Sequence, residues 1–150
     1  MTILQINTVL NSGSVGRIVE DIGNKVIESG GESHTAFSRY GQPSKSNSFR
    51  IGSSFDLASH VLYTRITDRH GFGSSGATKK LVNYIDQIEP DIIHLHNIHG
   101  YYLNIEILFE YLKEKNHNVV WTLHDCWPFT GHCTYFDSVN CNKWKTRCCS

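Results

Sequence analysis

The stretch MTILQINTVLNSGSVGRIVEDIGNKVIESGGESHTAFS, residues 1–38, decides the fold class. Residues 2–7 are short and β-rich, as in a buried strand. A Gly/Ser turn at residues 11–17 follows, and apolar residues spaced three and four apart then predict one face of a helix: Val15, Ile18, Val19, Ile22, Val26 and Ile27. Residues 34–38 form the second strand. Strand, turn, helix and strand in this order make a βαβ unit.

The alternation of strands and helices continues along the chain. Residues 40–54 are rich in Ser, Asn, Gly and Lys, and we predict a loop there. Further helices are expected at residues 57–66, 78–88 and 105–112, and strands at residues 91–96 and 118–123. The predicted fold class is α/β, a Rossmann-like, doubly wound parallel sheet with helices on both faces.

Composition excludes several classes of function. Lys and Arg number 14, as do Asp and Glu, so a formally neutral chain gives no electrostatic reason to expect nucleic acid as a partner. No apolar run approaches the roughly 20 residues of a membrane helix. The first 11 residues lack the features of a secretory signal. We therefore expect a cytoplasmic protein.

Polar clusters follow three of the predicted strands. Residues 13–17 follow the first, residues 94–100 begin within the strand at 91–96 and run past its end, and residues 124–127 follow the last. Ligands of parallel sheets bind beyond the carboxyl ends of the strands. The three clusters therefore predict a binding site at one edge of the sheet.

The first cluster has the character of an anion site. Backbone N–H groups at a helix N-terminus hold phosphate, and glycine lets a ligand approach them closely. We predict ligand contacts for Gly13, Ser14, Gly16 and Arg17. An ordinary tight turn is the alternative. The loop is not the GxGxxG pattern, and no acidic residue follows the second strand, so a nicotinamide cofactor is not expected.

The second and third clusters are rich in histidine. His94 and His96 lie on the same side of an extended strand and line a pocket or, less favoured, bind zinc. Asn97 and His99 lie past the strand end, where they can hydrogen-bond a polyol. His124 followed by Asp125 suits general acid–base chemistry, or is a partly buried pair at a strand end.

All five cysteines lie in the last quarter of the chain. Cys133, Cys141 and Cys148 are spaced about evenly among aromatic residues, which leaves a structural zinc site or a disulfide-tied loop open. Their spacing does not match the paired pattern of common zinc ribbons. The remaining interpretation is that they are buried cysteines acting as small apolar residues.

Two blocks carry a family resemblance. PDIIHLHNIHG at residues 90–100 and WTLHDCWPFTGHC at residues 121–133, with the opening strand and the loop at residues 13–17, resemble bacterial retaining glycosyltransferases of the GT-B fold. The resemblance is to family 4-like members of the group that assembles capsular, exopolysaccharide and colanic-acid-type polymers, and it covers essentially all 150 residues.

The resemblance implies two Rossmann-like domains facing across a cleft, without a cofactor or metal in catalysis. Carried over to this chain, the loop at residues 13–17 approaches the donor phosphates, and His124 lies beside the transferred sugar. Asn97 and His99 line the acceptor side, and Asp125 supports the loop of His124. The implied partners are a nucleotide-sugar donor, a glycan or lipid-linked acceptor, and the inner face of a membrane that the full-length enzyme contacts peripherally.

We therefore expect residues 1–150 to be a truncated, N-terminal, acceptor-side domain that lacks the C-terminal donor-binding domain and is inactive alone. The whole enzyme would transfer a hexose from a nucleotide-diphosphate sugar in surface polysaccharide synthesis. Two alternatives stay open. One is a non-catalytic α/β module that binds sugar or phosphate, and the other is a small zinc-binding protein that uses the cysteine tail.

Overall fold

A five-stranded, all-parallel sheet forms the centre of the computed structural model, which describes residues 1–131 and 133–146. The spatial order is β3-β2-β1-β4-β5. The strands are β1 (Thr2–Ile6), β2 (Glu32–Phe37), β3 (Asn47–Arg50), β4 (Ile92–Leu95) and β5 (Val119–Trp121). Strand order reverses direction between β1 and β4, so the carboxyl edge near β1 and β4 is a topological switch point. The predicted fold class is confirmed.

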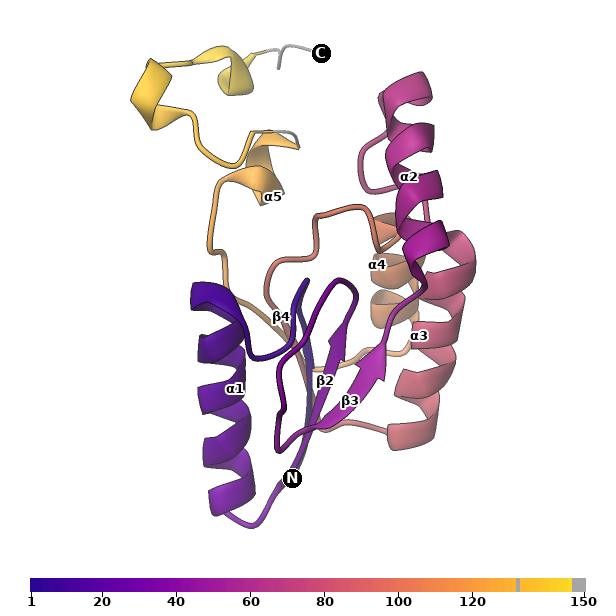
Figure 1. The fold of residues 1–150 in the computed structure, drawn as a ribbon, viewed down its shortest axis with the longest axis vertical. Helices are drawn as coiled ribbons and strands as arrows, with labels where there is room; N and C mark the ends of the chain where they lie inside the picture. Colours follow the sequence, from indigo (N-terminus) through magenta and orange to yellow (C-terminus); the bar gives the residue numbers. More distant parts are fainter. Residues whose placement is uncertain (132, 147–150) are drawn as a thin grey trace.

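The helices are divided between the two sides of the sheet (Figure 1). α1 (Gly13–Glu28) lies on one side, and α2 (Ser54–Thr67), α3 (Ser75–Ile88) and α4 (Ile105–Glu114) lie on the other. Right-handed crossovers require this division, because the chain moves outward from β1 to β3 and then returns past β1 to β4 and β5. The short α5 (Trp127–Thr130) lies beyond the carboxyl edge of the sheet, and the 3₁₀ turns Asp137–Val139 and Lys143–Lys145 follow it.

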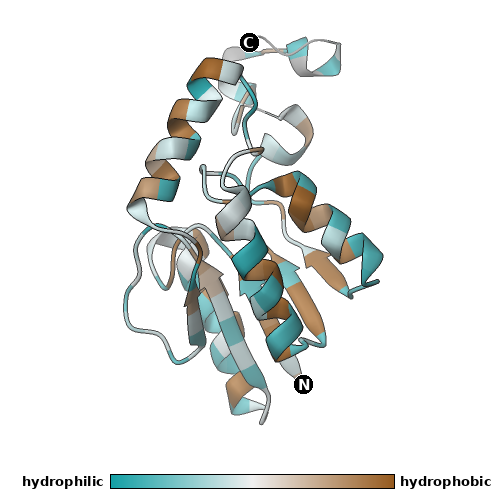
Figure 2. Cartoon of the chain, turned by 90° about the vertical axis from the view of Figure 1, so that its right-hand side faces the viewer, coloured by the Kyte–Doolittle hydropathy of each residue, from teal (hydrophilic) through white to brown (hydrophobic). Residues whose placement is uncertain are grey.

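The hydrophobic core lies on the α3 and α4 side of the sheet. Hydropathy alternates along the helices in Figure 2, as expected for helices that bury one face. The core is formed by Leu4, Ile6, Ala36, Ile51, Ala77, Leu81, Ile85, Ile93, Leu95, Ile98, Tyr102, Leu103, Leu108, Tyr111, Leu112 and Trp127.

The interface between α1 and the sheet is polar, and this corrects the predicted helix face. The buried stripe of α1 consists of Gly16, Val19, Glu20 and Gly23, whereas Ile18 is 44% exposed. The reason is the sheet beneath the helix. On this side it presents Gln5, whose Nε2 donates to the Val19 carbonyl over 2.8 Å. A polar sheet face selects small and polar residues of the helix for burial.

The predicted loop at residues 40–54 contains a strand instead. β3 pairs in parallel with β2, and Phe49 lies opposite Ala36. Phe49 stacks on Tyr84 of α3 with ring centroids 4.3 Å apart. β3 is an edge strand with mostly exposed, polar residues, so it lacks the apolar pattern that reveals a buried strand.

No helix within residues 1–131 and 133–146 is long and apolar enough to cross a bilayer.

Candidate functional site

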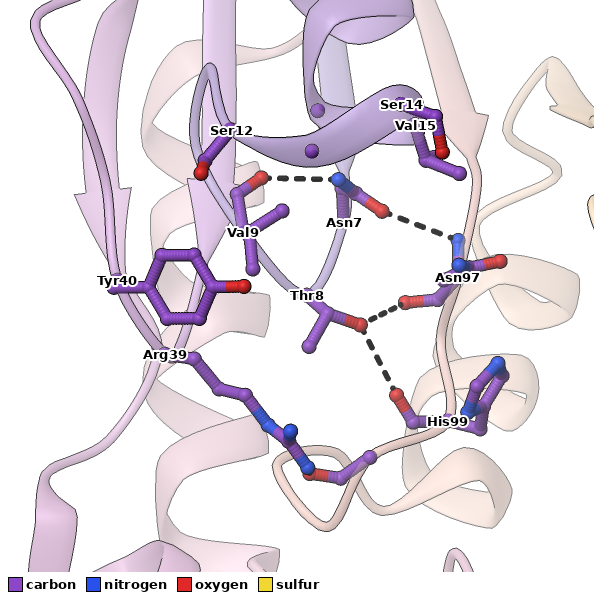
Figure 3. A pocket seen from close by; sticks show the side chains of 13 residues that line it. Asn7, Thr8, Val9, Ser12, Ser14, Val15, Arg39, Tyr40, Asn97 and His99 are labelled. Carbon is purple, nitrogen blue, oxygen red and sulfur yellow. Dashed lines mark hydrogen bonds between the residues drawn. The ribbon is translucent and has the colours of Figure 1, made fainter.

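A pocket of about 280 Å³ opens at the carboxyl edge of the sheet, beside the start of α1 (Figure 3). Tyr40 and Arg39 lie on one side of it, and Asn97 and His99 lie on the other. Its lining residues come from the segments that follow β1, β2 and β4: Asn7, Thr8, Val9, Ser12, Gly13, Ser14, Val15, Gly16, Arg39, Tyr40, Asn97, His99 and Gly100. The pocket therefore combines the first two polar clusters that the sequence placed at this edge.

The N-terminus of α1 is open toward this pocket. The Ser12 side chain, at the N-cap, makes no capping hydrogen bond, and the first turn carries no acidic residue. The first N–H groups of a helix have no intrahelical acceptor, and the helix dipole makes this end positive. Gly13, at φ 65°, starts the helix, and a Cβ at Gly16 would lie 3.0 Å from Val9. The geometry suits an anion held by backbone amides.

Asn7 and Thr8, just after β1, tie the two walls of the pocket together. Asn7 Nδ2 donates to the Val9 carbonyl over 2.9 Å, and its Oδ1 accepts from the Asn97 backbone over 3.4 Å. Thr8 Oγ1 lies 3.0 Å from the carbonyl oxygen of Asn97 and 3.2 Å from that of His99 (Figure 3). These side chains hold the loop after β4 against the loop after β1. Neither residue was predicted from the sequence as part of the site.

Arg39 supplies the positive charge at the rim. It follows β2, and its Nη2 donates to the Gly100 carbonyl over 3.3 Å, so the guanidinium spans the pocket edge. A ligand contact was predicted from the sequence for Arg17 instead, but Arg17 is an exposed residue of α1 that does not line the pocket. A search for polar residues after the second strand, as after the other three, would have found Arg39.

His99 and Asp125 form a close pair behind the pocket. His99 Nε2 lies 2.7 Å from Asp125 Oδ2, and the carboxylate side chain is only 9% exposed. The other oxygen, Oδ1, accepts from the Trp127 backbone N–H over 2.9 Å. A carboxylate held in this way orients the imidazole. Asp125 thus contacts His99 directly, and its bond to Trp127 also holds the loop that follows His124.

Histidines of the second and third clusters, His94, His96 and His124, form a column of imidazoles on the α1 side of the sheet. His94 and His96 lie on the same side, as predicted, with ring centroids 4.0 Å apart. His96 Nδ1 lies 3.0 Å from His124 Nε2, and His94 Nε2 lies 2.8 Å from Thr122 Oγ1. Burial lowers the pKa of His96 to about 3, with smaller contributions from His94 and His124. Burial also lowers the pKa values of His94 and His124.

A metal centre finds no support in the described part of the chain, where no group of three or more His, Cys, Asp or Glu side chains could hold an ion. Cys126, Cys133 and Cys141 are half-buried free thiols. Cys148, the third member of the predicted cysteine set, lies outside the described residues. The zinc hypothesis for that set remains a prediction.

Fold and site together define a class of protein. A parallel α/β domain with helices on both faces and a pocket at its switch point is a Rossmann-like domain. The chain is similar to the colanic acid biosynthesis glycosyl transferase WcaC of Escherichia coli (strain K12), with 28% identity over 161 aligned positions. That similarity confirms the resemblance to a colanic-acid-type glycosyltransferase that was drawn from the sequence.

The alignment covers 99% of this chain and 38% of WcaC, so the chain spans well under half the length of that relative. No family model matches the chain, and no solved structure matches it.

Proposed function

We propose that this chain is the acceptor-side domain of a glycosyltransferase that moves a hexose from a nucleotide-diphosphate sugar to a glycan or lipid-linked acceptor in surface polysaccharide synthesis. The similarity to WcaC supports glycosyl transfer in general. One observation carries the proposal furthest. The pocket at the start of α1 combines a helix N-terminus without a side-chain cap and Arg39 with the His99–Asp125 pair on the same sheet edge.

The amide and arginine groups suit the phosphates of a sugar donor. During transfer, negative charge accumulates on the departing nucleoside diphosphate. Amides at residues 13–16 and the Arg39 guanidinium would stabilise this charge, because such donors are already oriented before reaction. The N-terminus of α1 has no side-chain cap, and the helix dipole adds partial positive charge at this side of the pocket.

The histidines suit the hydroxyl groups of sugars. Asn97 and His99 line the pocket wall and would bind acceptor hydroxyls, with Asp125 holding His99 in place. His124 would contact the transferred sugar. These assignments use imidazoles as hydrogen-bonding groups and proton acceptors, and they require neither metal nor cofactor.

The domain assignment is part of the proposal. Residues 1–150 would form one Rossmann-like domain, and a second domain elsewhere in the enzyme would bind most of the donor. WcaC is long enough to contain such a domain, because the alignment leaves most of it unmatched. Stabilising the leaving group would then need donors from both domains, so residues 1–150 alone would be inactive.

The test is a transfer assay on the polypeptide encoded by the whole reading frame that contains these residues. UDP-glucose, UDP-galactose, GDP-mannose and GDP-fucose are each supplied with a lipid-linked glycan extract, and released UDP or GDP is measured. We expect acceptor-dependent release from one donor. Arg39→Gln should reduce that release about tenfold, since a charge-assisted hydrogen bond contributes on the order of 1.5 kcal/mol.

Arg17→Gln is the matched control, because it removes the same charge from a residue outside the pocket. Its activity should stay within about twofold of wild type. Absence of turnover with every donor, together with tight phosphate or sugar binding, would favour the non-catalytic binding module instead. Equal effects of the two arginine substitutions would show that Arg39 acts only through net charge.

A further inference from the structure

A buried hydrogen-bond chain runs from α1 through the sheet to His124. Gln5 Nε2 donates to the Val19 carbonyl over 2.8 Å, and Gln5 Oε1 lies 3.3 Å from His96 Nε2. His96 Nδ1 then lies 3.0 Å from His124 Nε2. Gln5 is fully buried and His96 is 2% exposed, so water does not compete for these contacts. Neither Gln5 nor His96 has a role in the proposed transfer reaction.

The Val19 carbonyl determines which atom donates and which accepts in each of these hydrogen bonds. The Val19 carbonyl can only accept, so the Gln5 amide must present its NH₂ to Val19 and its oxygen to His96. That oxygen also can only accept, so the proton of His96 lies on Nε2. The ring orientation of His96 is fixed as well, because both of its nitrogens have partners.

His96 is neutral at physiological pH. Burial lowers its pKa to about 3, and the His94 ring at 4.0 Å adds to the cost of charging it. A neutral imidazole with its proton on Nε2 has a lone pair on Nδ1. The partner of that lone pair, His124 Nε2, must therefore donate. In neutral His124 the other ring nitrogen, Nδ1, then carries no proton.

We propose that Gln5 and His96 are positioning residues that fix the proton of His124 on Nε2 and leave Nδ1 as a hydrogen-bond acceptor. Among the described residues, no protein group occupies His124 Nδ1. An acceptor nitrogen selects a ligand that donates, which a hydroxyl does and a phosphate oxygen does not. The sugar-hydroxyl part of this statement rests on the proposed function, whereas the position of the proton does not.

The alternative is that these residues form a buried polar network that only stabilises the fold. The two accounts differ in one observable. A purely structural network leaves His124 free to exchange between its two neutral tautomers, as imidazole does in solution, whereas a directed chain holds one. Shifting the proton of His124 by a change at Gln5, which does not contact it, would therefore reveal the positioning role.

The experiment is ¹⁵N NMR of histidine side chains in the labelled chain at pH 7.5, where two-bond correlations assign the tautomer of each ring. We expect His96 and His124 each to show a single Nε2–H tautomer. In Gln5→Leu the acceptor for His96 is lost, and both rings should become mixtures of tautomers. His94→Phe is the control, because His94 bonds Thr122 and not His124, and it should leave the tautomer of His124 unchanged.

Three results would overturn the proposal. They are a protonated Nδ1 on wild-type His124, a mixture of tautomers in the wild type, and a folded Gln5→Leu variant with an unchanged His124 signal. If Gln5→Leu fails to fold, His96→Phe replaces it, and the wild-type spectrum decides the proton positions alone. The measurement needs no substrate, so failure of the glycosyltransferase proposal would leave its result unaffected.

Discussion

Gly23→Ala should loosen α1 from the sheet and so disturb the wall of the candidate site. A Cβ at this position would lie 2.6 Å from Ser46 Oγ and 2.8 Å from Ser33 Oγ, well inside ordinary contact at 3.4 Å. These two hydroxyls bond each other over 2.8 Å beneath the helix. The methyl group must therefore displace either the helix or the serine pair.

The magnitude follows from three contributions. Overpacking a buried site costs about 1–3 kcal/mol, and loss of the serine hydrogen bond costs about 1 kcal/mol. The better helix propensity of alanine returns about 1 kcal/mol. The free energy of unfolding should thus fall by about 1–3 kcal/mol, which lowers the midpoint of urea denaturation by roughly 1 M.

Gly76→Ala is the matched control for this prediction. Gly76 also lies in a helix, α3, but a Cβ there meets nothing within 4 Å, so the substitution should be neutral or stabilising by up to about 1 kcal/mol. Urea denaturation followed by circular dichroism compares the two variants with wild type. Equal midpoints for Gly23→Ala and Gly76→Ala would refute the close packing of α1 on the sheet.

Three further predictions concern a helix cap, a buried imidazole and the His–Asp pair. Ser53→Ala removes half of the capping box with Asp56 at the start of α2 and should cost about 1 kcal/mol in chemical denaturation. Because the pKa of His96 falls from 6.5 to about 3 on folding, the unfolded state binds its proton first as pH drops. The free energy of unfolding should therefore decline as the pH falls from 6.5 toward 3, by up to about 1.4 kcal/mol per pH unit. His96→Phe should flatten that decline when denaturation is measured at a series of pH values. Asp125→Asn turns an amide NH₂ toward His99 Nε2 and so reverses the tautomer of that ring. Transfer by the whole enzyme should fall about 100-fold in steady-state assays, and unchanged turnover would remove this pair from the mechanism.

The sequence predicted the parts of the fold that depend on strong periodicity. The strands near residues 2–7, 34–38, 91–96 and 118–123 and the helices between them all form, within a few residues of the expected limits. β3 was not predicted because an exposed edge strand has no buried face and therefore no apolar signature. The buried face of α1 was not predicted because it depends on which side chains the sheet presents, which lies outside the helix sequence.

The candidate site was predicted in outline and revised in detail. Gly13, Ser14, Gly16, Asn97 and His99 do line one pocket, because the carboxyl ends of parallel strands converge at one edge. The choice of Arg39 over Arg17 depends on the direction that each side chain takes, which a linear pattern does not contain. The pairing of Asp125 with His99, and not with its neighbour His124, likewise depends on the relative positions of two loops.

The pocket at the start of α1 is the centre of this account, and an anion titration tests it most directly. The labelled chain is titrated with UDP, with sodium sulfate at equal ionic strength as the control, and amide and arginine side-chain signals are followed by NMR. We predict saturable shifts confined to the amides of residues 13–16, to Asn97 and to the Nε–H of Arg39, and their loss in Arg39→Gln. Shifts that never saturate, that sulfate reproduces, or that appear on another face of the domain would contradict the assignment of this pocket to donor phosphates.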